Sequence, residues 1–311
     1  GMVLSAIVLS GLLSEWTLRI LEIETEPPSL GRVGEVVPIV SQVRNVARFS
    51  PAFAVGLSQF VRDGDAQSRV PGPFRLRIEP SEVSELFSHF EPERRGLYVI
   101  DYTAAHTTYP FGFFEKTRRF GRGAPASFWV GPKRVPVRDI SKALTSQLGY
   151  SPAKRPGRGE EFFSLRPYRE GEDPRLIHWR SSARAGKWVV REQEASAGRR
   201  VVLVLDGILA LTASKREEAL AIFASVADQL LSAGLGVGIS APGIFLGPDL
   251  GGRQQTEIIS RLARLDFDEP TPHAAVGPDT ARVVLSCQPR STTGGATTID
   301  IFSLSTAEAD A

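Results

Sequence analysis

The side chains best suited to bind a ligand or to react lie in one segment, residues 166–192. In this segment arginines and acidic residues alternate with aromatic residues. A guanidinium group can hold a carboxylate or a phosphate through two parallel hydrogen bonds. The segment therefore suits either an ion-paired clamp between parts of the chain or a surface that grips an acidic peptide or a phosphate. Because acids are interleaved with the arginines, the pattern favours the clamp. The candidate residues for either role are Arg169, Asp173, Arg175, His178, Trp179, Arg180, Arg184 and Arg191.

Catalysis and nucleic-acid binding suit this segment less well. His178 lies between Ile177 and Trp179, which predicts a packed strand residue rather than a general base. The interleaved acids would repel a phosphate backbone. We therefore expect no nucleic-acid partner. An enzyme centred on the segment is the alternative hypothesis.

Asp206 is the second place where chemistry is expected, because it ends the apolar run of residues 201–205. Ligands of open α/β sheets collect at the carboxyl ends of the strands, and Mg²⁺ prefers oxygen ligands. The positions that should supply hydroxyl groups hold Ile208 and Ala210 instead. We interpret Asp206 as the remnant of a metal site and expect no metal. A metal-dependent adhesion module with a degenerate site is the alternative.

Other catalytic signatures are missing from the sequence. It contains no phosphate-binding loop of the GxxxxGK[ST] type, and its four histidines are scattered without ligand spacing. The single cysteine, Cys287, excludes an internal disulfide and is predicted to be a buried strand residue. These absences predict a protein that is not an enzyme and uses no cofactor.

The elements that must position these residues form two predicted domains. Residues 18–130 contain short alternating stretches separated by proline and glycine, which predict an antiparallel β-sandwich of immunoglobulin-like type. Residues 199–311 alternate apolar strands with helices, which predict a small doubly wound α/β domain. Residues 131–198 are a linker followed by the arginine-rich segment, and we expect an exposed loop at residues 154–159.

One helix of the second domain has recognisable end signals. Ser214 followed by Glu217 forms a capping-box pattern, which predicts that the helix begins at Ser214. Gly234 is the expected end.

Residues 2–13 are apolar or small throughout. Twelve residues are too few to cross a hydrocarbon core, which needs about 20. They are predicted to be either the end of a transmembrane helix or a short buried helix.

Charge is unevenly distributed along the chain, although the net charge is only +2. Residues 131–200 hold sixteen Lys and Arg against eight Asp and Glu, whereas residues 201–311 hold seven against thirteen. This asymmetry indicates either two domains that complement each other or an acidic or phosphate-bearing partner.

The arginine-rich segment resembles the signature of the bacterial domain of unknown function 58 family. Upstream, Arg94-Arg95-Gly96 and Tyr109-Pro110-Phe111-Gly112 resemble two further motifs of that family, with Tyr109 in place of an acid. The matching signature residues are Arg166, Tyr168, Gly171, Arg175, Ile177, Trp179, Ser182, Ala183, Arg184, Gly186, Val190, Arg191 and Glu192.

The resemblance implies an architecture and a kind of partner. Family members carry two N-terminal transmembrane helices, which would make residues 2–13 the end of the second. A β-sandwich and a von Willebrand factor A-like (Rossmann-like) domain follow and face the cytoplasm. Members are encoded beside MoxR-type AAA+ ATPases and are thought to act with them in protein assembly or maturation. The expected function is therefore a membrane-tethered, non-enzymatic protein-binding or scaffold protein.

Overall fold

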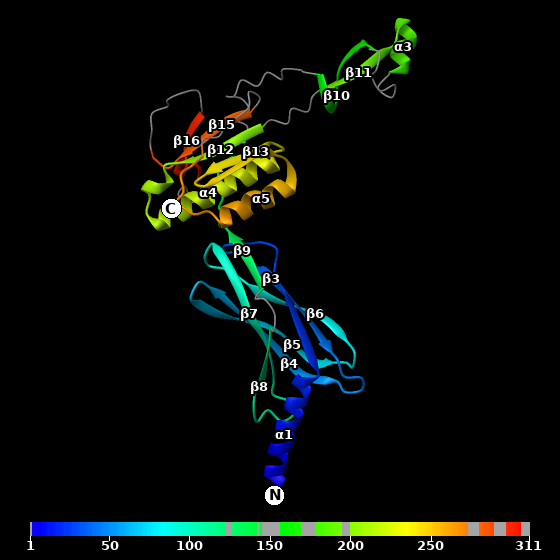
Figure 1. Cartoon of the computed structure of the whole chain (residues 1–311), viewed down its shortest axis with the longest axis vertical. Coiled ribbons are helices and arrows are strands. Elements are labelled where there is room, and N and C mark those ends of the chain that lie inside the picture. Colours follow the sequence, from blue (N-terminus) through cyan, green and yellow to red (C-terminus); the bar gives the residue numbers. More distant parts are fainter. Residues whose placement is uncertain are drawn as a thin grey trace. The chain divides into compact units, whose positions relative to one another are not determined.

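The protein is described here from a computed structural model, which covers residues 2–121, 126–141, 144, 156–168, 178–194, 200–272, 280–288 and 297–305 (Figure 1). The chain forms two compact units. The first contains residues 1–135 and 256–266, and the second contains residues 136–255 and 267–311. The chain is a mixed α/β protein in which sheets predominate.

The first unit contains two sheets of mainly antiparallel strands. The smaller sheet has the order β1-β3-β6, formed by Leu21–Glu26, Val37–Asn45 and Val83–Phe90. The larger has the order β2-β9-β7-β4-β5, formed by Gly31–Arg32, Ala126–Gly131, Gly96–Thr107, Ala52–Asp63 and Ala66–Ile78. Strand β8 (Lys116–Phe120) pairs with β7. The two sheets build the β-sandwich of Figure 1.

Alternation of apolar and polar residues explains how the sandwich forms. In β3, every second residue from Val37 to Asn45 is buried while the residues between them are more exposed, as expected for a strand with one face toward a core. Ile39 packs in a cluster with Tyr98, Phe128 and other residues of the larger sheet. The core therefore lies between the two sheets.

The turn before β7 is fixed by two neighbouring side chains. The Tyr98 hydroxyl donates to the Arg94 carbonyl oxygen at 3.0 Å and accepts from the Arg94 amide at 3.2 Å. Burial raises the pKa of Tyr98. The Arg95 guanidinium donates to three carbonyl oxygens at the end of a helix, two in its last turn and one just beyond it. These carbonyls belong to Leu262, Ala263 and Leu265.

Helix α1 (Met2–Arg19) begins in the apolar stretch and continues beyond Leu13. Its last turns pack on the sandwich, where Thr17 and Leu18 are buried, whereas Leu4 and Leu12 in its first turns are exposed. In the part of the chain that the structure describes, no helix is both long enough and apolar enough to span a membrane.

The second unit contains a five-stranded sheet with the order β14-β13-β12-β15-β16. All neighbours are parallel except β13 and β14. In chain order these strands are Arg200–Asp206 (β12), Gly236–Ala241 (β13), Ile244–Asp249 (β14), Thr280–Ser286 (β15) and Thr297–Asp300 (β16). Helix α4 (Ala213–Ser232) links β12 to β13, and α5 (Gly251–Ala263) precedes β15.

The capping prediction for α4 is wrong at its start and correct at its end. The N-cap is Thr212, and the helix begins at Ala213, so Ser214 lies inside the first turn. Thr212 makes no side-chain capping bond, but the Arg216 guanidinium donates to the Leu209 and Leu211 carbonyl oxygens in the preceding loop. Gly234 follows the helix with φ of +80°, the left-handed conformation expected at a helix end.

A small arm completes the second unit. Strand β10 (Pro156–Pro167) pairs antiparallel with β11 (Val189–Glu194), and the short helix α3 (Trp179–Ala185) precedes β11. The expectation of a loop at residues 154–159 is wrong from Pro156 onward, because these residues pair with β11. The arm contains most of the arginine-rich segment.

Candidate functional site: the arm

His178 is the N-cap of helix α3, which begins at Trp179. The His178 Nδ1 atom accepts from the Ser181 amide at 3.3 Å and lies 2.9 Å from the Ser181 hydroxyl. These contacts provide a partner for one of the free amides at the start of the helix. The prediction that His178 is a packed strand residue is therefore wrong, because His178 caps the start of α3 instead.

Ser182 ties α3 to the strand that follows it. Its hydroxyl accepts from the Val189 amide at 3.0 Å and lies 3.1 Å from the His178 carbonyl oxygen. The His178 amide donates to the Val189 carbonyl oxygen at 2.9 Å. Ser182, Val189 and Val190 are buried, so they form a small core beneath the helix.

Two tryptophans stand on the outer side of this core. Gly186 ends α3 with φ of +63°, and the chain then turns to place Trp188 beside the helix that Trp179 begins. The Trp188 ring contacts Tyr168 edge to face with ring centres 5.6 Å apart, and its carbonyl oxygen accepts from the Tyr168 amide. Even so, Trp179 and Trp188 remain 65% and 61% exposed.

A shallow hollow of about 500 Å³ lies between the two tryptophans. Its lining consists of Trp179, Ser182, Ala183, Gly186, Lys187 and Trp188. Exposed aromatic area beside a concave surface is typical of a site that receives a side chain or a short segment of a partner.

The surface around the hollow is cationic. Arg180, Arg184 and Lys187 are exposed. Within the described residues, no hydrogen bond or ion pair engages any of these three side chains. Cations without internal partners are available to an acidic ligand, and the arginines can bind a carboxylate through two hydrogen bonds.

The structure brings together four of the eight candidate residues of the segment: His178, Trp179, Arg180 and Arg184. Arg191 lies in β11, and only its backbone is described. Arg169, Asp173 and Arg175 lie outside the described residues. The predicted pairing of arginines with the segment's own acids therefore stays a prediction.

Lys187 and Trp188 are site residues that the sequence argument missed. The signal that could have found them is Gly186, because a glycine at the end of a helix reverses the chain and returns the next residues to the helix. Trp188 thus stands near Trp179, although nine positions separate them in the sequence.

Asp206, which the sequence led us to interpret as the remnant of a metal site, is the last residue of β12. Asp206 is in register with Ser286 on β15, and Ser286 is in register with Asp300 on β16, a carboxylate that the sequence argument missed. Ser286 and Asp300 have local partners, since the Ser286 hydroxyl donates to the Gln288 carbonyl oxygen and an Asp300 carboxylate oxygen accepts from the Phe302 amide. Among the described residues, no group of three or more His, Cys, Asp or Glu could hold a metal ion.

Cys287 follows Ser286 and is buried, and its amide donates to the Asp206 carbonyl oxygen. Burial, with smaller contributions from the carboxylates of Asp206 and Asp300, raises the pKa of its thiol to about 12. A thiol with so high a pKa is a poor nucleophile at neutral pH.

Comparison with known families supports the resemblance over part of the chain. The model of the family described as "Protein of unknown function DUF58" matches residues 164–290, which include most of the arm and most of the five-stranded sheet. A search of curated proteins found no match.

Two solved structures illustrate distant likenesses to this chain. The CARDB domain of the PF1109 protein from Pyrococcus furiosus is 13% identical and has a TM-score of 0.23, with 35% of this chain and 91% of that chain covered. The sporulation control protein Spo0M from Bacillus subtilis is 13% identical, with a TM-score of 0.21 and coverage of 36% and 49%. TM-scores this low support no conclusion about function.

Proposed function

We propose that this chain is a non-enzymatic protein-binding or scaffold protein and that the arm is its partner-binding surface. The observation that carries the proposal is the hollow between Trp179 and Trp188, whose side chains are both more than half exposed. Tryptophan and arginine are the residue types that most often dominate binding energy at protein interfaces. On the arm these types surround a concave surface.

The charges favour an acidic segment as the ligand. Arg180, Arg184 and Lys187 surround the hollow and have no partners in the described part of the chain. An extended segment with an aromatic or aliphatic side chain between carboxylates would fill the hollow and pair with the cations.

The family resemblance supplies the class of partner, a MoxR-type AAA+ ATPase. In this proposal the chain acts with such an ATPase in the assembly or maturation of other proteins. The match of residues 164–290 to DUF58 supports this assignment because the matched region contains α3, β11 and both tryptophans of the arm.

The proposal extends to the fold of the second unit, which we assign to the von Willebrand factor A-like class. The four parallel strands β13-β12-β15-β16 support it, since the chain passes from β13 on one side of β12 to β15 on the other, as in doubly wound sheets. The aliphatic residues at positions 208 and 210 favour a domain that binds partners without the metal of that class.

Membrane tethering is the last part of the proposal, with the sandwich and the second unit facing the cytoplasm. Helix α1 supports it, because no charged residue occurs between Met2 and Ser14 and the exposed side chains there include Leu4, Val8 and Leu12. A helix that is apolar on all sides is normally covered by protein or lipid.

A pull-down with a MoxR-type ATPase encoded beside this chain tests the proposal. We expect the double variant Trp179→Ala/Trp188→Ala to lower affinity roughly 30-fold or more, because each residue is a candidate hot spot. Arg180→Ala/Arg184→Ala should weaken binding less and should reduce its dependence on salt.

Matched controls are Phe245→Ala and Arg282→Ala, which remove an exposed aromatic residue and an exposed cation from the five-stranded sheet. Both should bind as the parent chain does. Failure to recover the ATPase with and without nucleotide would exclude this partner. Equal loss in the arm variants and the controls would exclude the arm as the binding surface.

A further inference from the structure

Exposed aromatic side chains surround α1 where it leaves the sandwich. One comes from α1, one from the connection between β3 and β4, and three from the connection between β7 and β8. These residues, here called the aromatic collar, are Trp16, Phe49, Phe111, Phe113 and Phe114, and each is at least 42% exposed. Figure 1 shows the β7–β8 connection beside α1 at this end of the sandwich.

Buried polar contacts hold the loop that carries Phe49. Asn45 is fully buried, and its side-chain Nδ2 atom donates to the carbonyl oxygens of Ser50 and Ile78. Its side-chain oxygen accepts from the Ala47 amide at 3.0 Å. Three hydrogen bonds from one side chain fix both ends of the loop, so the exposure of Phe49 is built into the backbone.

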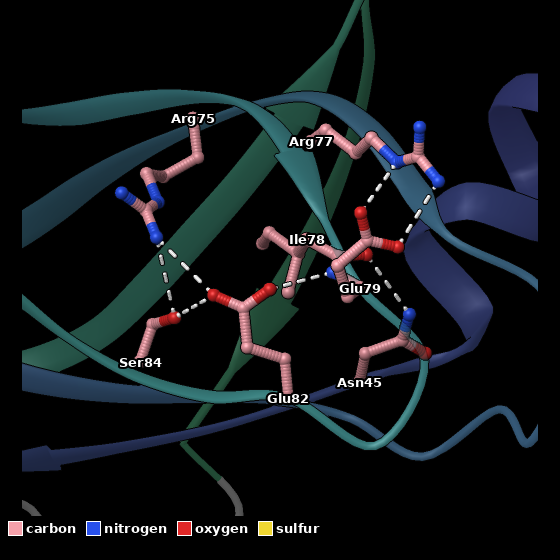
Figure 2. A network of polar contacts seen from close by, with 7 residues as sticks. All are labelled: Asn45, Arg75, Arg77, Ile78, Glu79, Glu82 and Ser84. Carbon is pink, nitrogen blue, oxygen red and sulfur yellow. Dashed lines mark hydrogen bonds and ion pairs between the residues drawn. The ribbon is translucent and has the colours of Figure 1, made fainter.

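The network around Asn45 extends across the neighbouring turn, as Figure 2 shows. A Glu82 carboxylate oxygen accepts from the Glu79 amide, and the other carboxylate oxygen pairs with the Arg75 guanidinium at 3.2 Å. The backbone amide of Asn45 donates to the Glu82 carbonyl oxygen at 3.0 Å. The turn between β5 and β6 therefore braces the Phe49 loop.

The loop that carries the three phenylalanines is fixed to α1. The Ser14 hydroxyl donates to the Tyr109 carbonyl oxygen at 2.6 Å, and the Tyr109 ring stacks on Phe53 with centres 4.8 Å apart. Beyond the phenylalanines, Lys116 pairs with Glu15 of α1 at 3.3 Å. The loop is thus held at both ends against the helix, while its aromatic side chains face outward.

Cations accompany the aromatic residues. The Arg48 guanidinium lies 5.3 Å from the centre of the Phe49 ring, and Arg118 donates to the Leu18 and Arg19 carbonyl oxygens at the end of α1. Glu15 offsets part of this charge through its pairs with Arg19 and Lys116. The cations of this end are Arg19, Arg48, Lys116 and Arg118.

The apolar part of α1 indicates which kind of surface would cover the collar. Leu4, Val8, Leu9 and Leu12 line an open apolar face of α1 beyond the collar. Apolar helix, then aromatic side chains, then cations is the order in which a bilayer presents hydrocarbon, interface and anionic headgroups. We propose that the collar rests in the interfacial layer of a phospholipid bilayer and fixes how the sandwich stands on it, an inference that rests on the proposed tethering through α1.

Site-directed fluorescence tests this proposal on the full chain. Cys287 is the single cysteine, so a Cys287→Ala background accepts one new cysteine at Phe113 for an environment-sensitive label such as NBD. With vesicles of phosphatidylcholine and phosphatidylglycerol, we expect the label emission to shift to shorter wavelength and to lose access to iodide. A label at Asp65→Cys, in the hairpin beyond the far end of β4, should stay in water.

Flotation of the same samples separates the two proposals. If the protein floats with the vesicles but the label at position 113 stays in water, the collar proposal is wrong and the tether stands. If the protein does not float, both fail. If the labels at positions 113 and 65 shift equally, the contact is unspecific and the collar proposal is wrong.

A second variant tests the collar without a label. Phe111→Ser/Phe113→Ser/Phe114→Ser should lower the vesicle partition coefficient roughly tenfold or more, because three apolar side chains no longer leave water. Circular dichroism should show an unchanged fold, since these side chains are exposed. Unchanged partitioning by a folded variant would contradict the proposal.

Discussion

The arm and the β-sandwich both expose aromatic side chains, but they support them differently. The collar stands on loops braced by Asn45 and Tyr109, above a core that both sheets share. In the arm, Trp179 is the first residue of a helix of seven residues, and Trp188 lies between that helix and β11. The arm core that the structure describes includes only Ser182, Val189 and Val190.

This difference indicates how each surface would meet its ligand. A surface with little buried area beneath it opens locally at low free-energy cost. The arm can therefore reshape around a partner, and Arg180, Arg184 and Lys187, which have no partners among the described residues, would gain partners in doing so. The cations of the collar already contact rings, carboxylates or carbonyl oxygens of the sandwich and α1, which suits a surface that keeps its shape.

The largest expected effect tests the core beneath the sandwich. Phe128 is buried and contacts the rings of Tyr98 and Phe90. Phe128→Ala should lower the free energy of unfolding by about 3–5 kcal/mol, because it removes a large side chain and leaves a cavity. Urea unfolding measures this change. Phe245→Ala, which truncates an exposed ring, is the control and should stay within about 0.5 kcal/mol. A loss below about 1 kcal/mol for Phe128→Ala would show that the sandwich is not the more rigid support.

A smaller and local effect is expected in the arm. Ser182→Ala removes the acceptor of the buried Val189 amide, so it should cost about 1–3 kcal/mol. The loss should be confined to α3 and β11 and should appear as faster hydrogen exchange of their amides. Ser181→Ala is the matched control and should cost less, since the Ser181 amide keeps His178 as its acceptor. Faster exchange throughout the second unit would contradict the local character of the arm.

The smallest effect concerns pH and the brace of the collar. The Ser84 hydroxyl, then the Glu79 amide and the Arg75 guanidinium, hold the pKa of Glu82 below its ordinary value of 4.5. A carboxyl with a lowered folded-state pKa stabilises the protein above pH 4.5, and this contribution is lost as the pH falls through the folded-state pKa. The melting temperature of Glu82→Gln should therefore depend less on pH below 4.5 than that of the parent chain. Identical pH profiles would show that the brace contributes nothing.

Local patterns in the sequence anticipated many of the elements. The apolar run ending at Asp206 is β12, and the alternation in residues 37–45 matches β3, because burial on two faces or on one face leaves a direct mark on composition. The turn at Gly234 could also be predicted, because the end of a helix often requires the left-handed backbone conformation that glycine adopts without strain.

Features that depend on contacts distant in sequence could not be predicted. Thr212 rather than Ser214 is the N-cap of α4, and both are residue types that favour helix starts, so the sequence around them could not decide between the two. Tyr109 stacks on Phe53 of β4, whereas Phe111 contacts Phe113 and remains exposed, a difference that the residues of this loop do not indicate. Asp300 joins the row of Asp206 and Ser286 only through the register of three strands.

The buried thiol of Cys287 offers a way to measure local opening of the sheet without an added label. With a pKa of about 12, almost none of the thiol is the reactive thiolate at neutral pH. Alkylation must therefore wait until the end of β15 opens to solvent. The rate at which a thiol reagent modifies the parent chain would measure that opening directly, and slower modification in the presence of a partner would show that binding stabilises the sheet.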